Sequence, residues 1–188
     1  MTDLFDVDWS QLPAPQDDGA ATHLFGFRLA SVPLPATNGE EIVLSEIHGR
    51  AVVYIYPMTG RPGTPLPGRW DMLPGARGCT PQACEFRDHS VELKNVGAEQ
   101  LYGLSTQSTE YQSEVVERLH LPFPLLSDRA LAMTNAMQLP TFEVEGMILL
   151  KRLTMIIRDG VIEHIFYPVF PPDQNAIGVI NWLSENPI

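Results

Sequence analysis

The segment AVVYIY, from Ala51 to Tyr56, is a continuous run of β-branched and aromatic residues that stops at Pro57. Strands with one solvated face alternate apolar and polar side chains, whereas strands covered on both faces are apolar throughout. The segment QLYGLS, from Gln100 to Ser105, has a similar character. Both segments therefore predict strands that are buried inside a sheet.

Turn and helix signals place the remaining elements around these strands. Asn38-Gly39 and Asp159-Gly160 are each flanked by apolar runs, which predicts two hairpins, one over 36–45 and one over 153–167. Helical patterns are expected from Thr80 to about Asn95, over 108–119, over 128–137, and in a final segment capped by Asp173. The order β–α–β–α–α–β–β–α indicates an α/β protein with a mixed central sheet flanked by helices.

The chain has 188 residues, which suits one globular domain with modest extensions. Residues 1–22 are rich in Pro, Asp and Ala and show no period, so we expect an N-terminal arm followed by a domain over 23–188. Trp9 in this arm is a candidate for a dimer contact, although chain termini are also often unattached.

Charge and hydropathy narrow the classes of partner. The net charge is −11 at pH 7, and the 12 basic residues form no block, so nucleic acid would be repelled. No apolar run approaches the ~20 residues of a membrane span. The N-terminus is acidic and has no basic region followed by an apolar stretch, so we expect no secretory signal and a cytoplasmic location.

The two cysteines, Cys79 and Cys84, are the only ones in the chain, and they lie at the start of the helix expected from Thr80. In that position Cys79 is beside the unpaired N–H groups and the positive dipole end of the helix, with Arg77 close in sequence. Both features stabilise a thiolate, which is the nucleophilic form of cysteine. We therefore expect Cys79 to be reactive and Cys84 to lie on a covered face one turn further on.

The spacing of the cysteines limits what they can form. Five residues of α-helix span roughly 7.5 Å and about 140°, which separates the two Cα atoms by roughly 8 to 9 Å, beyond the ~7 Å limit for a disulfide. The pair therefore either forms no disulfide or forms one only after the first turn unwinds. Two buried structural thiols are the plainer alternative. A zinc site with His89 lacks the usual ligand spacing, so we expect no metal and no cofactor.

The segment GCTPQACEFRD, from Gly78 to Asp88, resembles the signature of the PrxQ or bacterioferritin-comigratory-protein class of peroxiredoxins. Further resemblances follow in the same order and spacing, at 44–57 (LSEIHGRAVVYIYP), 103–108 (GLSTQS), 121–128 (LPFPLLSD) and 151–162 (KRLTMIIRDGVI). The resemblance covers roughly residues 25–186. It implies a thioredoxin-like fold with the N-terminal hairpin of the peroxiredoxins.

The resemblance implies an enzyme, a thiol-dependent peroxidase that reduces hydrogen peroxide or organic hydroperoxides. Cys79 would attack the peroxide and become a sulfenic acid, and Cys84 would resolve it to an intramolecular disulfide. Arg152 would hold the peroxide and stabilise the thiolate, although an arginine before a strand is more often a solvated strand end. Thioredoxin or a similar dithiol would be the reductant, and the chain would be a monomer or a homodimer. The residues implied to bind substrate are Tyr56, Pro57, Gly78 and Thr80.

The sequence departs from the family pattern at two places. Ala76 stands where the family usually has a Thr, three residues before the reactive cysteine, and Thr59, Thr64 or Thr80 are the alternative sources of a hydroxyl. Pro57 precedes Cys79 by 22 positions, so the Pro- and Gly-rich loop 58–77 is about 15 residues longer than usual. We expect this loop, with Trp70, to be either a lid or an inert surface excursion.

Two alternatives remain open from the sequence. TPQAC, from Thr80 to Cys84, faintly resembles the Thr-Pro-x-Cys of another peroxiredoxin class, which would make Cys84 the nucleophile. A redox sensor or binding module on the same scaffold, slowed by the loss of the Thr, is the rival function.

Overall fold

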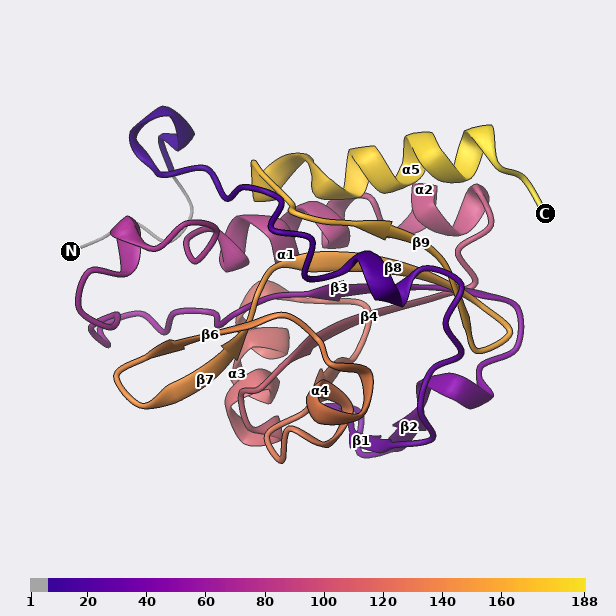
Figure 1. The fold of residues 1–188 in the computed structure, drawn as a ribbon, viewed down its shortest axis with the longest axis horizontal. Coiled ribbons are helices and arrows are strands. Elements are labelled where there is room, and N and C mark those ends of the chain that lie inside the picture. The colour runs from indigo at the N-terminus through magenta and orange to yellow at the C-terminus, as the bar shows by residue number, and fades with distance from the viewer. Residues whose placement is uncertain (1–6) are drawn as a thin grey trace.

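The computed structural model describes residues 7–188, so residues 1–6 of the expected arm lie outside the described part. Its centre is a five-stranded mixed sheet with the order β5–β4–β3–β8–β9 (Figure 1). Strand β4 is parallel to β3 and to β5, while β8 is antiparallel to β3 and to β9. The five strands are β3 (Arg50–Ile55), β4 (Gln100–Ser105), β5 (Leu125–Ser127), β8 (Leu153–Arg158) and β9 (Val161–Phe166).

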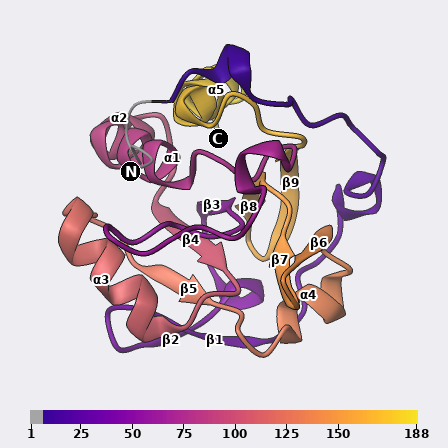
Figure 2. The ribbon, with the colours of Figure 1, turned by 90° about the vertical axis from the view of Figure 1, so that its left-hand side faces the viewer.

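Helices cover the sheet on both sides, which confirms the predicted fold class. Figures 1 and 2 show α1, α2 and α5 along one side and the β1–β2 hairpin with α4 along the other. The helices are α1 (Cys79–Asp88), α2 (Ser90–Asn95), α3 (Thr109–Leu119), α4 (Ala132–Met137) and α5 (Asn175–Glu185). The two separate hairpins are β1 (Pro33–Pro35) with β2 (Glu41–Val43), and β6 (Thr141–Val144) with β7 (Met147–Leu150).

Strand β3 is buried along its whole length, as its composition predicts. Ala51, Val53 and Ile55 point into a core shared with α4 and the N-terminal segments. Val52 and Tyr54 point to the opposite face, into a core shared with α1, α2, α3 and α5. Successive side chains of a strand face opposite ways, so only an unbroken apolar run can satisfy both cores.

Two predicted helix starts are wrong, and neither helix has a side-chain cap on the residue before it. Helix α1 begins at Cys79 after Gly78, whose φ of 98° favours glycine, so Thr80 lies inside the helix and is not its N-cap. Helix α5 begins at Asn175, and Asp173 does not cap it. Instead the Glu85 carboxylate of α1 accepts hydrogen bonds from the Ala176 and Ile177 N–H groups.

Two further predicted helices differ in extent. The helix expected up to Asn95 is interrupted at His89, which separates α1 from α2. The helical pattern over 128–137 forms a helix only from Ala132. Asp128 nevertheless caps the N-terminus of α4, because its carboxylate accepts hydrogen bonds from the Met133 and Thr134 N–H groups at 3.1 and 2.7 Å.

Strand β5 and the β6–β7 hairpin were not predicted from the sequence. Strand β5 has only three residues and follows two prolines, Pro122 and Pro124. The β6–β7 turn is Glu145-Gly146, and both residues have positive φ, at 48° and 77°. Asn-Gly and Asp-Gly are the usual signals for such a turn, so a turn with Glu in the first position escapes prediction.

The long loop 58–77 is packed rather than extended over the surface. Trp70 is 4% exposed and forms a small core with Ala76, with Val144 of β6 and with Leu149 of β7. Met58, Leu66, Leu73 and Phe142 pack around this core. The loop and the β6–β7 hairpin therefore bury each other's apolar side chains, while the choice between a lid and an inert segment stays a prediction.

We predict that Trp70→Ala lowers the free energy of unfolding by about 3 kcal/mol, because it removes the largest side chain of this core. Urea unfolding followed by far-UV circular dichroism measures the change. Met72→Ala, in the same loop but 64% exposed, serves as the control and should change stability by less than about 0.5 kcal/mol. Equal stability of the two variants would contradict the existence of a stabilising loop core.

Candidate active site

Cys79 is the first residue of α1 and is 4% exposed. Its Sγ lies 3.1 Å from Arg152 Nη2, which donates a hydrogen bond to the sulfur. The carbonyl oxygen of Ala76 lies 3.6 Å from the same Sγ. The sulfur thus meets a fixed positive charge at the N-terminus of a helix, the combination that stabilises a thiolate.

The Arg152 guanidinium is 3% exposed and is enclosed by the end of the loop. Its Nη2 lies 3.3 Å from the carbonyl oxygens of Gly75 and Ala76 and 3.1 Å from that of Arg77. These contacts fix the loop end and the start of α1 around one cation. Arg152 is therefore no solvated strand end.

A buried polar chain continues from Arg152 into the core. Arg152 Nη1 donates to the side-chain oxygen of Gln82 on α1. Gln82 Nε2 donates to Asn175 Oδ1 at 2.8 Å, and Thr154 Oγ1 donates to the same oxygen at 2.7 Å. None of these three residues was predicted from the sequence, where the only signal was the position of Gln82, one helical turn after Cys79.

Cys84 lies on the same helix and is half-buried against the core that contains Cys79. Burial raises the pKa of the Cys84 thiol, and the positive charge of Arg87 opposes that rise. Arg87 Nε pairs with Asp88 Oδ1 at 2.8 Å. Both cysteines are free thiols on an intact helix.

The hollow next to Cys79 is very small, at about 10 Å³. Its lining comes from the loop and from the start of α1, and consists of Met58, Gly60, Leu66, Trp70, Arg77, Gly78, Cys79 and Thr80. About one water needs a volume of this order. The loop therefore covers the thiol in this conformation.

The substrate-binding residues implied by the sequence divide into two groups. Gly78 and Thr80 line the hollow. Tyr56 and Pro57 are buried and do not line it; Tyr56 lies in the same core as Cys79, with its hydroxyl 3.4 Å from Gln112 Nε2. Arg77, expected to add positive charge, also lines the hollow, and its Nη1 is 3.6 Å from Asp71 Oδ1.

The N-terminal arm reaches this site through Trp9. A Cβ atom added to Gly78 would lie 2.5 Å from the Trp9 ring, so the ring is packed directly on the residue before Cys79. Trp9 Nε1 donates to Asp173 Oδ2 at 2.7 Å, and the ring meets Phe170 edge-on. Asp173, expected to cap a helix, anchors the arm instead.

The described residues show neither a metal-binding cluster nor a membrane-spanning helix. Within residues 7–188, no cluster of three or more His, Cys, Asp or Glu side chains is placed to hold a metal ion. Over the same residues, no helix is long and apolar enough to cross a membrane.

Comparison with known proteins decides the family. The sequence model of the Redoxin family matches residues 14–180. Peroxiredoxin Bcp of Escherichia coli K12 is 32% identical over 158 residues, which are 81% of this chain and 90% of that protein. The chain belongs to the peroxiredoxins.

More distant relatives agree with this assignment to the PrxQ/Bcp class. Chloroplastic peroxiredoxin Q of Sedum lineare is 29% identical over 82% of this chain and 77% of its own length. Peroxidoxin BcpB of Mycobacterium tuberculosis is 26% identical and superimposes with a TM-score of 0.69 over 87% of this chain and 98% of its own. This peroxiredoxin is accordingly a thiol-dependent peroxidase with a thioredoxin-like fold.

The three candidate hydroxyls lie in different places in this peroxiredoxin. Thr80 lines the hollow beside Cys79. The Thr59 hydroxyl donates to Gln107 Oε1 at 3.0 Å, and Thr64 is exposed on the far side of the loop. Of these three threonines, only Thr80 lines the hollow beside Cys79.

We predict that Gln82→Leu destabilises this peroxiredoxin by about 1–3 kcal/mol, because it leaves polar groups of Arg152 and Asn175 buried without their partner. Urea unfolding measures the effect. Gln174→Leu is the control, since that side chain is exposed and bonds only to the neighbouring Asp173 carbonyl. A loss of equal size in both variants would contradict the network.

Proposed function

We propose that this peroxiredoxin reduces hydrogen peroxide or organic hydroperoxides with Cys79 as the nucleophile and Cys84 as the resolving thiol. The observation that carries the proposal is the 3.1 Å contact between Arg152 Nη2 and Cys79 Sγ at the first residue of α1. Cys84 sits one turn inside the helix, and burial raises the pKa of its thiol even though Arg87 opposes that rise, which favours Cys79 over the alternative register.

The first step is nucleophilic substitution on oxygen. The Cys79 thiolate attacks the terminal oxygen of ROOH, the O–O bond breaks, and RO⁻ leaves and takes up a proton as ROH. The sulfur is oxidised to a sulfenic acid, and the peroxide is reduced. Arg152 supplies positive charge where the leaving oxygen becomes negative, in a site that the loop shields from bulk water.

Gly78, Thr80, Tyr56 and Pro57 complete the proposed peroxide site. The backbone N–H groups at the start of α1 and the Thr80 hydroxyl supply donors at the hollow. Tyr56 and Pro57 form the support below, since both are buried at the end of β3. Thr80 then takes the role of the hydroxyl that Ala76 lacks.

The second step joins the two cysteines. The Cys84 thiolate attacks the Cys79 sulfenic acid, and the disulfide forms with loss of water. Because both residues lie on one intact helix, the first turn of α1 has to unwind before the sulfurs meet. A dithiol such as thioredoxin then reduces the disulfide, becomes oxidised itself, and returns both thiols.

Charge and composition support a proposal for the location, domain organisation and partners of the chain. We place the chain in the cytoplasm, as a monomer or homodimer with an arm over 1–22 and a catalytic domain over 23–188. A net charge of −11 disfavours nucleic acid and anionic membrane surfaces as partners. The proposed chemistry uses thiols alone and requires no metal or organic cofactor.

The test is to treat the reduced protein with one equivalent of hydrogen peroxide and to map the products by mass spectrometry. We expect a Cys79–Cys84 disulfide in the wild type, sulfenic acid on Cys79 in Cys84→Ser, and unmodified Cys84 in Cys79→Ser. Sulfenic acid on Cys84 in Cys79→Ser, together with an unmodified Cys79 in Cys84→Ser, would reverse the two roles.

Turnover separates the enzyme from the redox sensor. With thioredoxin, thioredoxin reductase and NADPH present, a peroxidase consumes many equivalents of peroxide per protein molecule. A sensor stops after about one equivalent. Peroxide consumption that ends after one equivalent, with the disulfide formed, would overturn the peroxidase proposal in favour of the sensor.

We also predict that disulfide formation displaces Trp9, because its ring packs on Gly78 at the turn that must unwind. Oxidation should therefore change the tryptophan fluorescence, and Trp9→Phe should remove most of this change. Trp182→Phe, on α5, is the control and should retain it. A redox-linked change of the same size in Trp9→Phe would show that the arm stays in place.

A further inference from the structure

A second and much larger hollow lies on the other side of the loop. It has a volume of about 780 Å³ and lies between the loop, the start of α3 and the β6–β7 hairpin. Its apolar lining comes from both the loop and the hairpin, namely Met58, Pro65, Leu66, Pro67, Met147, Ile148 and Leu149. Met147 and Ile148 are 37% and 46% exposed, so the cleft presents apolar side chains to solvent.

The cleft adjoins the hollow at Cys79. Met58, Gly60 and Leu66 line both spaces and therefore form the wall between them. Met58 and Leu66 contribute half-buried side chains to this wall, whereas Gly60 contributes only backbone. The wall between the cleft and the thiol is thus one layer of residues thick.

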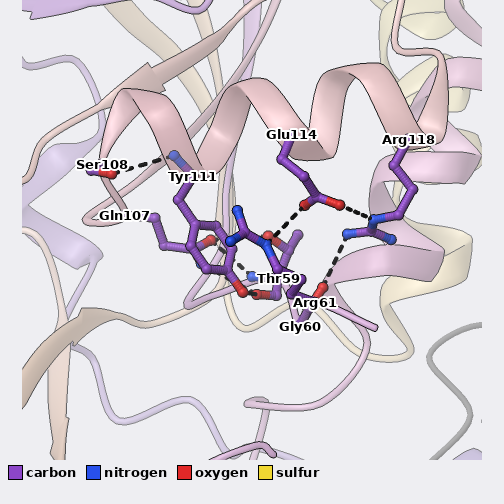
Figure 3. A network of polar contacts seen from close by, with 8 residues as sticks. All are labelled: Thr59, Gly60, Arg61, Gln107, Ser108, Tyr111, Glu114 and Arg118. Carbon is purple, nitrogen blue, oxygen red and sulfur yellow. Dashed lines mark hydrogen bonds and ion pairs between the residues drawn. The ribbon is translucent and has the colours of Figure 1, made fainter. Parts of the chain in front are cut away.

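The near end of the loop is fixed to α3, as Figure 3 shows. The Thr59 N–H donates to Gln107 Oε1 at 2.9 Å, and the Tyr111 hydroxyl donates to the Thr59 carbonyl oxygen at 3.1 Å. Arg118 Nη2 donates to the Gly60 carbonyl oxygen at 3.0 Å. The Arg61 guanidinium lies over the Tyr111 ring, 4.4 Å from its centre.

The far end of the cleft wall is fixed to the hairpin. The Gly68 N–H donates to Glu145 Oε1 at 2.8 Å, and Trp70 packs on Val144 and Leu149. The intervening residues 61–67 cross from one anchor to the other. The cleft is therefore preformed, because both ends of this wall are attached to regular secondary structure.

The sizes of the two spaces suit different parts of one ligand. A volume near 10 Å³ holds about one water, whereas apolar pockets of roughly 300–1,000 Å³ hold organic molecules. We propose that the cleft binds the apolar body of a bulky organic hydroperoxide, and that Leu66 and Met58 shift to let its O–O end reach Cys79. This inference rests on the proposed function and makes the inserted loop the determinant of substrate size.

The test compares two peroxides in one double variant, Met147→Gln/Ile148→Thr. We expect the ratio of kcat/KM for cumene hydroperoxide to kcat/KM for hydrogen peroxide to fall about tenfold, mainly through the KM for the bulky substrate. Ile177→Thr is the matched control, with an isoleucine 38% exposed on α5, outside the cleft. An unchanged ratio in the double variant, or an equal fall in Ile177→Thr, would overturn the proposal.

A binding measurement decides the same question without turnover. In Cys79→Ser, 2-phenyl-2-propanol (the unreactive alcohol that corresponds to cumene hydroperoxide) should shift the methyl resonances of Met147 and Ile148 and leave that of Ile177 in place. Absence of these shifts at millimolar alcohol would overturn the cleft assignment. Loss of peroxidase turnover in the wild type, with the shifts present, would instead refute the proposed function and keep the cleft.

Discussion

The buried guanidinium of Arg152 is the interaction on which the rest of this site depends. A buried cation must be surrounded by acceptors, because it has lost the water that would otherwise solvate it. Here the acceptors are three consecutive loop carbonyls, a glutamine of α1 and the cysteine sulfur. The need to satisfy one charge therefore brings together the loop end, helix α1 and the strand that follows Arg152.

The loop 58–77 borders two spaces, the small hollow at Cys79 and the large cleft. Its own core, centred on Trp70, holds it against the β6–β7 hairpin, while its first residues are fixed to α3. With both ends attached, the segment between them covers Cys79 on one face and lines the large cleft on the other. The loop thus covers Cys79 and also contributes apolar side chains to the adjoining cleft.

Helices α1 and α5 are joined by two buried contacts. Glu85 accepts hydrogen bonds from the first N–H groups of α5, and Gln82 bonds to Asn175 at the same end. Burial raises the pKa of the Glu85 carboxyl, and the two backbone hydrogen bonds oppose that rise. The second turn of α1 is therefore held firmly to α5, whereas its first residue is preceded by a glycine on which Trp9 packs. The proposed disulfide would unwind only the first turn of α1, directly before the part that Glu85 holds to α5.

The sequence by itself determined the elements whose signals are local. The unbroken apolar run at β3 requires two covered faces, and the Asp159-Gly160 turn requires the β8–β9 hairpin. The sequence also placed Cys79 at a helix start and, through the family resemblance, singled out Arg152. Only the tertiary structure decided what surrounds them. Glu85 replaced Asp173 at the start of α5, Gln82 and Asn175 joined the arginine network, and Trp70 folded the long loop over the thiol. These contacts join residues far apart in the chain, and no local pattern of residue types encodes which distant partner satisfies a buried polar group or fills a core.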